Sequence, residues 1–331
     1  MAHIGLQVLA EGRTQESSFN PINTRPMKYI EQQRQKAIEI RDQFFKDPGQ
    51  GIFMGQEREF VLSDRKANLW KGIEKDAIEY FARNGIGWWK STDKPTGHLL
   101  SSQIACVNHL YPIRHRQDLA NTILKQIDPS FKQALVVDDG FVEFEKVGQQ
   151  VLGKERALTR GANSTSIDAM MLGEKNDGKK VLILIEWKYT EHYTNSSLLV
   201  AKSGTSRLDN YKALLEAENC PIQCANLEDL FYEPFYQLMR QTLLGWTMTK
   251  RMEYNTTDWL HLHIIPSENK ELKEYVTSPG LAGNTMEAAW KNVLRQPDKY
   301  IVIDPADFLH PIRQCADTKS ITSYLEQRYW K

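Results

Sequence analysis

The sequence predicts an α/β fold in which a mixed central β-sheet is flanked by helices. Three observations support this prediction. Apolar residues recur at helical spacing in residues 66–110, strand-like alternation replaces that pattern in residues 141–189, and both patterns then follow one another along the rest of the chain. The chain has 331 residues, of which 41% are hydrophobic, so it can bury a sizeable core without disulfides.

The N-terminal region is predicted to be an arm followed by a helix. Residues 1–25 are polar and lack a periodic pattern, and we expect them to form a loosely ordered arm. Residues 27–45 have a helix-like pattern, and two glycines lie within residues 50–55. We therefore divide the chain into an N-terminal arm and helical extension, residues 1–55, and one larger domain, residues 56–331.

Two helices are predicted before the strands. The first covers residues 66–83, where a single apolar stripe includes Trp70 and Ala77 and where Asn84-Gly85 favours a stop. The second covers residues 98–110 and ends before Pro112.

The remaining elements are predicted from changes between the helical spacing and the strand-like alternation of apolar residues. Strands are expected at residues 141–147, 164–172, 181–189, 259–265 and 299–304, and helices at residues 206–217, 233–248 and 312–330.

The charge composition excludes one class of nucleic-acid-binding protein. The chain has 42 Lys+Arg and 42 Asp+Glu, so it is not a polybasic protein that binds nucleic acid by charge alone. A local basic patch remains compatible with this balance. Between Lys146 and Lys212 there are 11 basic and 7 acidic residues, an excess of +4.

The sequence favours a cytoplasmic protein. Its first residues lack the basic and apolar regions of a signal peptide, and no apolar segment is long enough to span a bilayer. The four cysteines are too few and too scattered for a disulfide framework: Cys106, Cys220, Cys224 and Cys315.

A hairpin is predicted around Asp177-Gly178, a dipeptide that favours a tight turn between strands. A three-residue loop centred on residue 177 pairs residues whose numbers add up to 354, as those of Asp168 and Glu186 do. A two-residue loop would shift the register by only one position. Asp168 and Glu186 should therefore be close neighbours across the two strands.

The second strand of this hairpin ends in an unusual charged motif. Glu186 and Lys188 are two residues apart and share one face, while Trp187 points to the other. A buried aliphatic strand that brings a glutamate next to an aspartate would place two carboxylates in a poorly solvated site, where they repel. A divalent cation resolves this conflict, and two carboxylates with a backbone carbonyl suit Mg²⁺.

These residues resemble the motif of the PD-(D/E)xK nuclease superfamily, which includes many restriction endonucleases. The likeness rests on Ile-Asp168, an interval of 17 residues and Glu186-x-Lys188 at the end of an aliphatic strand; Ile167 replaces the proline of the motif. The resemblance implies a restriction-endonuclease-like core in which residues 56–331 are the catalytic domain. It implies that Asp168, Glu186 and the Trp187 carbonyl hold Mg²⁺, for which Mn²⁺ can substitute, and that Lys188 positions the attacking water.

The resemblance further implies an enzyme, a metal-dependent endodeoxyribonuclease that hydrolyses DNA phosphodiester bonds. DNA is the expected partner, and a homodimer that cuts both strands is compatible with it. The upstream segment also resembles uncharacterised bacterial restriction-endonuclease-like proteins, at Tyr80-Phe81, Ile86-x-Trp88, residues 98–103 and Asn108.

Four further residues are candidates for the site. Many members of the superfamily place an acidic residue on the first core helix, and Glu74 is the better placed glutamate of residues 66–83, although it could equally reach water. Gln103 could touch the site or the substrate backbone. Arg240 and Gln241 share one side of a helix with Gln237 and could hold a phosphate; a solvated helix face is the alternative.

His261 and His263 alternate on a predicted strand, so their rings share a face. Further metal ligands cannot be placed beside them, and we expect a partly exposed strand face. The spacing of the four cysteines does not match an iron–sulfur site.

Three alternatives remain open at this point. The first is a nuclease of the same fold that acts on RNA or on branched or damaged DNA. The second is a nucleic-acid-binding module without catalysis, against which the complete Asp, Glu and Lys set argues. The third is a non-nuclease in which these charges form a structural ion cluster.

Overall fold

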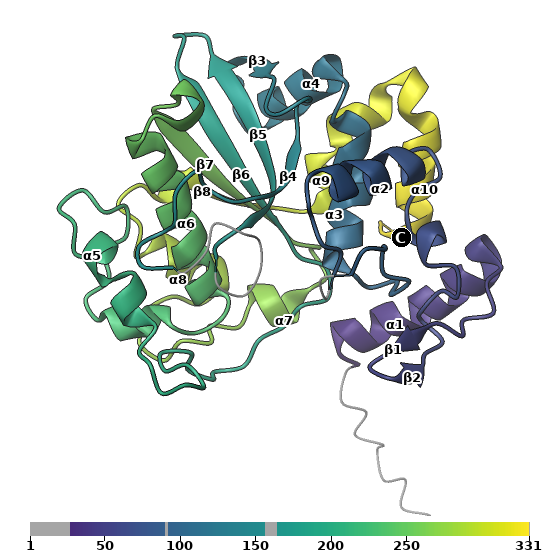
Figure 1. Ribbon diagram of the computed structural model, residues 1–331, viewed down its shortest axis with the longest axis horizontal. Coiled ribbons are helices and arrows are strands. Elements are labelled where there is room, and N and C mark those ends of the chain that lie inside the picture. The colour runs from purple at the N-terminus through teal and green to yellow at the C-terminus, as the bar shows by residue number, and fades with distance from the viewer. Residues whose placement is uncertain (1–26, 90–91, 156–163, 331) are drawn as a thin grey trace, which may run out of the picture.

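The structure is a computed structural model that describes residues 27–89, 92–155 and 164–330. It confirms the predicted fold class, because a mixed six-stranded sheet is flanked by helices (Figure 1). The expected arm, residues 1–25, lies outside the described residues.

The sheet is mixed. Its order is β3-β5-β6-β7-β8, and β4 also pairs with β5; these strands are β3 (Phe131–Leu135), β4 (Glu143–Lys146), β5 (Ile167–Lys175), β6 (Lys180–Trp187), β7 (Asp258–Ile264) and β8 (Tyr300–Ile303). Strands β3, β4 and β6 run antiparallel to β5, while β6, β7 and β8 are parallel. Strand β6 is central and is buried from Val181 to Trp187, as expected for an aliphatic strand covered on both faces.

The predicted hairpin is present in the predicted register. Ala169 pairs with Ile185 and Glu174 pairs with Lys180, so the residue numbers of each pair add up to 354. Gly178 has a φ of +83°, a backbone conformation that glycine adopts without strain. The local turn therefore determines which residues of β5 and β6 face each other.

Each face of the sheet packs against its own hydrophobic core. Val181, Ile183 and Ile185 belong to one core, and Leu182 and Leu184 belong to the other. The first core is covered by α2 (Glu74–Arg83), α3 (Ser102–Leu110), α4 (Gln117–Ile127) and α10 (Lys319–Arg328). The second is covered by α6 (Phe235–Lys250) and α8 (Met286–Lys291) (Figure 1).

The other elements are short or peripheral. They are α1 (Tyr29–Ile40), β1 (Ile52–Phe53), β2 (Gln56–Glu57), α5 (Lys212–Leu215), α7 (Lys270–Lys273) and α9 (Pro305–Phe308). Helix α1 packs against the larger predicted domain, since the Tyr29 amide donates to Glu271 and the Tyr189 hydroxyl donates to Gln33. The domain boundary at residue 55 stays a prediction.

Four predicted helices are shorter than expected. Helices α3 and α10 begin only at Ser102 and Lys319, after the expected residues 98 and 312. The prediction of one helix over residues 66–83 was wrong: a 3₁₀ turn at Arg65–Asn68 is separated from α2 by extended backbone at Leu69, and Gly72, a poor helix former, lies in the gap. Within residues 206–217 only a 3₁₀ turn and α5 form. Helix α4 and strand β3 were not predicted.

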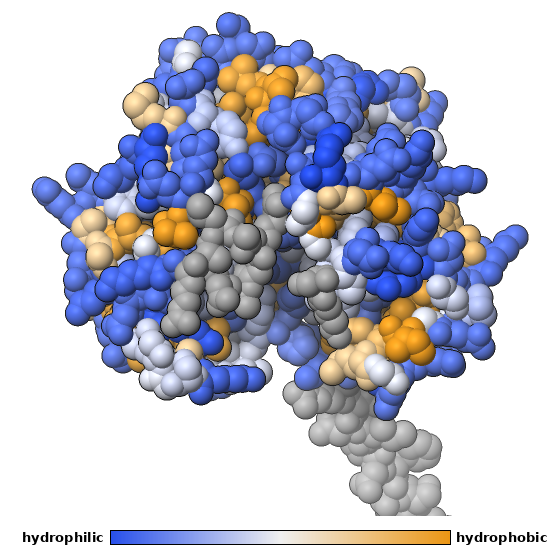
Figure 2. Space-filling view, in the orientation of Figure 1, coloured by the Kyte–Doolittle hydropathy of each residue, from blue (hydrophilic) through white to orange (hydrophobic). Residues whose placement is uncertain are grey.

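Hydrophilic residues cover most of the face shown in Figure 2, and hydrophobic residues form separate small patches there. Among the described residues, no helix is long and apolar enough to cross a membrane.

Candidate functional site

The candidate site lies where the backbone ladder between β5 and β6 ends. The last backbone pair is Ala169 with Ile185. Beyond it, Asp168 lies opposite Glu186, and the Trp187 amide donates a 2.8 Å hydrogen bond to Oδ2 of Asp168. The Asp168 carboxylate therefore accepts the bond that a backbone carbonyl would accept in a continuing ladder.

Glu186 and Lys188 form a buried ion pair beside Asp168. The Lys188 Nζ atom lies 2.7 Å from Oε1 of Glu186. Lys188 is only 5% exposed and Glu186 only 2%. The Trp187 ring points to the opposite face, where it packs against His109. The structure thus agrees with the predicted alternation of these three side chains.

Two amides of α6 hold this ion pair. Gln237 donates from Nε2 to Oε1 of Glu186 at 2.7 Å and accepts from Nζ of Lys188 at 2.6 Å. Gln241, one turn later, donates to the other carboxylate oxygen of Glu186. Both charged side chains are therefore fixed by a helix as well as by their own strand.

The electrostatics of the site couple these groups. Burial, followed by the charges of Glu186 and Glu145, raises the pKa of Asp168 well above its ordinary value, although Lys188 and the Trp187 amide act in the opposite direction. Burial lowers the pKa of Lys188, but Glu186 and weaker neighbours outweigh it, so the Lys188 pKa is raised and the ammonium stays charged. Negative charge thus accumulates around Asp168.

Glu145 is a third carboxylate at the site that the sequence analysis missed. Strand β4 pairs Phe144 with Ala169 and Lys146 with Ile167, which places Glu145 across from Asp168. Glu145 has a φ of +50°, which is uncommon for a residue with a side chain. Gln103 of α3 donates a 2.9 Å hydrogen bond to Oε1 of Glu145.

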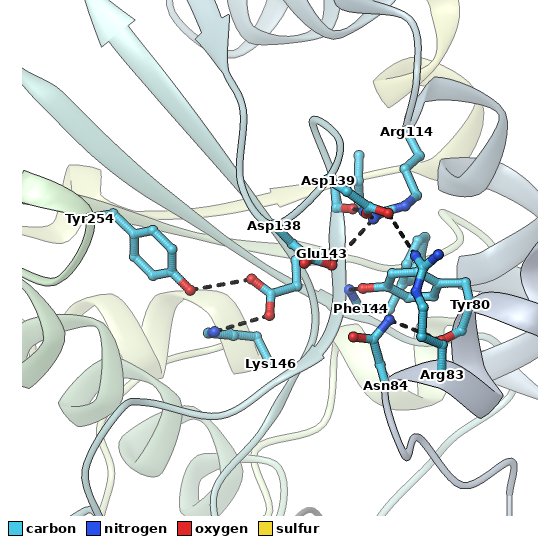
Figure 3. A network of polar contacts seen from close by, with 11 residues as sticks. Tyr80, Arg83, Asn84, Arg114, Asp138, Asp139, Glu143, Phe144, Lys146 and Tyr254 are labelled. Carbon is cyan, nitrogen blue, oxygen red and sulfur yellow. Dashed lines mark hydrogen bonds and ion pairs between the residues drawn. The ribbon is translucent and has the colours of Figure 1, made fainter.

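The residues on either side of Glu145 contact side chains other than those of α3. Lys146 pairs with Glu143 at 3.0 Å, and the Tyr254 hydroxyl donates to Glu143 (Figure 3). The fully buried Arg114 donates to the Val142 carbonyl and so holds the segment that leads into β4. Glu145, whose backbone is left-handed, thus bonds to α3, whereas Glu143 and Lys146 contact Tyr254.

The structure brings some of the predicted residues to the ion pair and places others elsewhere. Gln241 contacts Glu186, and Gln103 reaches Glu145. Arg240 instead donates to Thr165 and to the Ser164 carbonyl, so it holds the segment before β5. Glu74 is the first residue of α2, whereas the charges that act most strongly on Asp168 are those of Glu186, Glu145 and Lys188; a role for Glu74 stays a prediction.

The expectation that His261 and His263 lie on a partly exposed face was wrong. Strand β7 lies between β6 and β8, and both rings are completely buried. Nδ1 of His263 lies 2.7 Å from the Tyr300 hydroxyl, while neither Nε2 atom has a hydrogen-bond partner among the described residues. Burial, followed by the charge of Lys188, lowers the pKa of both rings, that of His261 to about 3, so they are neutral.

The donor set suits a hard divalent cation. Asp168 and Glu186 offer carboxylate oxygens from adjacent strand ends. Burial and the neighbouring carboxylates raise the pKa of Asp168, and a cation would relieve both effects. Within the described ranges, no three His, Cys, Asp or Glu side chains form a ready-made metal cluster. Mg²⁺ does not need one, because it binds through one or two carboxylates and keeps several waters.

Comparison with known proteins gives one match. No curated protein and no solved structure matches the chain. A family model described as "Restriction Endonuclease associating with ARP" matches residues 28–330, which include every candidate residue named above. With nearly its whole length covered, the chain belongs to this restriction-endonuclease family.

Proposed function

We propose that this protein is a Mg²⁺-dependent endonuclease of the PD-(D/E)xK type that hydrolyses DNA phosphodiester bonds. The observation that supports it most is the meeting of Asp168, Glu186 and Lys188 at the paired ends of β5 and β6. Membership of a restriction-endonuclease family supports a nuclease and a DNA partner. The predicted roles of the individual residues and of the metal belong to the proposal.

Each residue of the site has a part in this proposal. When bound, Mg²⁺ would make a water nucleophilic and stabilise the charge of the phosphoryl group. Asp168, Glu186 and the Trp187 carbonyl would hold the ion, and Mn²⁺ would substitute for it. Lys188 would orient the attacking water and neutralise developing negative charge.

The arrangement around Lys188 supports this assignment. Its ammonium is buried and charged, and Gln237 and Glu186 both bind it, so its position is fixed before substrate arrives. A preorganised charge of this kind contributes more to catalysis than a mobile one, because no reorganisation is needed during the reaction.

The proposal is tested by incubating duplex DNA, RNA and branched DNA with the wild-type protein and with Asp168→Ala, and by mapping the ends produced. We expect the wild type to cut DNA with Mg²⁺ or Mn²⁺, to stop cutting in EDTA, and Asp168→Ala to be inactive. Asp298→Ala, a change of an exposed aspartate just before β8, is the matched control and should remain active.

The same experiment separates the alternatives. Cleavage restricted to RNA or to branched DNA would support a nuclease with the same chemistry that acts on a different substrate. If the wild type binds DNA but cuts no nucleic acid with either metal, the protein is a binding module and the enzyme proposal is wrong.

A further inference from the structure

A polar groove of about 730 Å³ adjoins the candidate site along α6. Glu233, two residues before the start of this helix, lines the groove, and its carboxylate accepts a hydrogen bond from the backbone amide of Gln237. The charges of Lys188 and Glu186 also act on Glu233. The groove therefore begins one helical turn from the ion pair, since Glu233 lines the groove and Gln237 binds Glu186 and Lys188.

The lining of the groove is positively charged. Four of its residues are basic and two are acidic, a net charge of +2: Lys154, Lys202, Arg207 and Arg240 against Glu155 and Glu233. Of the basic groups, Lys154 and Lys202 are exposed and Arg207 is half-buried. These three residues fall within residues 146–212, the segment with the local excess of basic residues.

Cation–π contacts, hydrogen bonds and an ion pair connect the side chains in the floor of the groove. The guanidinium groups of Arg207 and Arg240 lie 6.0 Å and 5.3 Å from the centre of the Tyr236 ring. Glu155 accepts hydrogen bonds from Tyr211 and from the Thr165 amide and pairs with Arg240 at 3.4 Å. Glu155 and Arg240 thus neutralise each other. Lys154, Lys202 and Arg207 then exceed the remaining carboxylate, that of Glu233, by two positive charges.

The chemistry of the lining favours phosphate over bases. Ser203, Thr205 and Ser206 add hydroxyl groups beside the basic side chains. Both aromatic residues of the lining, Tyr211 and Tyr236, are buried in the floor, so their rings cannot offer a stacking platform to unpaired bases. Ammonium, guanidinium and hydroxyl groups are the side chains that contact the nucleic-acid backbone most often.

We propose that this groove binds the sugar-phosphate backbone of the nucleic-acid substrate next to the bond that is cut, through Lys154, Lys202 and Arg207. This inference rests on the proposed nuclease function and extends it, because it assigns a position to the substrate outside the carboxylate site. It also predicts recognition by charge, without base readout in this groove.

The test measures binding without cleavage. The full-length protein is titrated in EDTA against a short fluorescein-labelled DNA duplex and against an RNA duplex of the same sequence, over a range of salt concentrations, by fluorescence anisotropy. The variant is Lys154→Gln/Lys202→Gln. The control is Lys125→Gln/Lys319→Gln, which removes two exposed lysines of α4 and α10 from outside the groove.

We expect the groove variant to bind roughly tenfold more weakly than the wild type at low salt, and the slope of log K against log salt to fall by about 0.9 for each phosphate that is no longer neutralised. The control variant should bind as the wild type does. The tighter of the two duplexes identifies the substrate class. Circular dichroism and the unfolding temperature establish that both variants are folded.

Two results would overturn the inference: equal weakening by the groove and control variants, or unchanged binding by the groove variant. Both differ from a failure of the nuclease proposal. If the protein binds through Lys154 and Lys202 but cuts no nucleic acid, the groove proposal holds and the nuclease proposal is wrong. If it is a metal-dependent nuclease whose binding does not depend on these lysines, the nuclease proposal holds and the groove proposal is wrong.

Discussion

Asp168 accepts a hydrogen bond from the backbone amide of Trp187, with 2.8 Å between Oδ2 and the amide nitrogen. A side chain therefore completes the backbone ladder at the end of the hairpin. This bond joins the aspartate to the residue between Glu186 and Lys188. The end of the β5–β6 pairing therefore brings the three charged groups together, and Gln237 and Gln241 of α6 hold the side chains of Glu186 and Lys188 there. Burial and the neighbouring carboxylates raise the pKa of Asp168, which means that its ionised form opposes folding at neutral pH.

Replacing Asp168 by asparagine should separate stability from activity. The carbonyl oxygen of the new amide side chain can still accept the Trp187 amide hydrogen, while the buried negative charge is removed. Without divalent metal, we expect the unfolding temperature of Asp168→Asn to equal or exceed that of the wild type, and cleavage to be lost. Asp168→Leu, which removes the acceptor as well, should unfold at a lower temperature. Equal destabilisation by both changes would contradict this role of the hydrogen bond.

Disrupting the ion pair between Lys188 and Glu186 should reduce the free energy of unfolding most when only one partner is removed. Lys188→Met leaves a carboxylate that is 2% exposed without its cation, and we expect a loss of about 3–5 kcal/mol in the free energy of unfolding. Adding Glu186→Gln removes the uncompensated charge and should recover a large part of that loss. A double-mutant cycle in urea measures the coupling, and additive losses would show that the two residues do not stabilise each other.

Gln237 should act by positioning the two charged residues. Gln237→Leu keeps the volume of the side chain but removes the hydrogen bonds to Glu186 and Lys188. We expect a loss of about 1–3 kcal/mol in stability, because buried polar groups lose a partner. The turnover number should fall more than the Michaelis constant rises. Gln327→Leu, an exposed change on α10, is the control, and an equal effect on the turnover number there would refute a positioning role.

The hairpin could be predicted from sequence because its determinants are local. The Asp177-Gly178 turn and the aliphatic run that ends at Glu186 are close in the chain, and together they specify which residues of β5 and β6 pair. The common location of Asp168, Glu186 and Lys188 follows from the same local features. Sequence and structure agree here because no distant contact is needed to determine the register.

Other parts of the site depend on contacts between distant segments. Glu145 faces α3 because its backbone is left-handed, which strand alternation does not predict for a glutamate. Gln237 contacts residues about 50 positions earlier, and its side of α6 resembles a polar surface in the sequence. His261 and His263 are buried because β7 is an inner strand and their rings contact Thr242 of α6 and Tyr300 of β8. Two alternating histidines do not specify this arrangement.

Glu145 should control the ionisation of Asp168. Its charge is one of those that raise the pKa of Asp168, so Glu145→Gln should lower that pKa. The change is measured by NMR titration of the carboxyl carbon of Asp168 in the protein without metal. Glu143→Gln is the matched control, because Glu143 belongs to the same strand but pairs with Lys146. A larger shift from Glu143→Gln than from Glu145→Gln would exclude the proposed geometry.

Buried neutral histidines should make the protein sensitive to mild acid. Burial lowers the pKa of His109 and of His261 to about 3, and that of His263 falls well below its ordinary value. In the unfolded chain each ring takes up a proton below about pH 6.5, while the folded protein does not. At these rings the unfolded state therefore binds more protons, and their contribution to stability is lost as the pH falls from about 6.5 toward 3. The raised pKa of Asp168 acts with the opposite sign.

Each of the three rings should contribute up to about 1.4 kcal/mol for every pH unit in this window. Urea unfolding at several pH values between about 7.5 and 4.5 measures the slope of the unfolding free energy. His261→Gln should reduce the slope by about one proton, because it removes one group that titrates only in the unfolded state. His310→Gln, a change of an exposed histidine, should leave the slope unaltered. If His261→Gln leaves the slope of the unfolding free energy unchanged, His261 is protonated in the folded protein, which its burial beside Lys188 opposes.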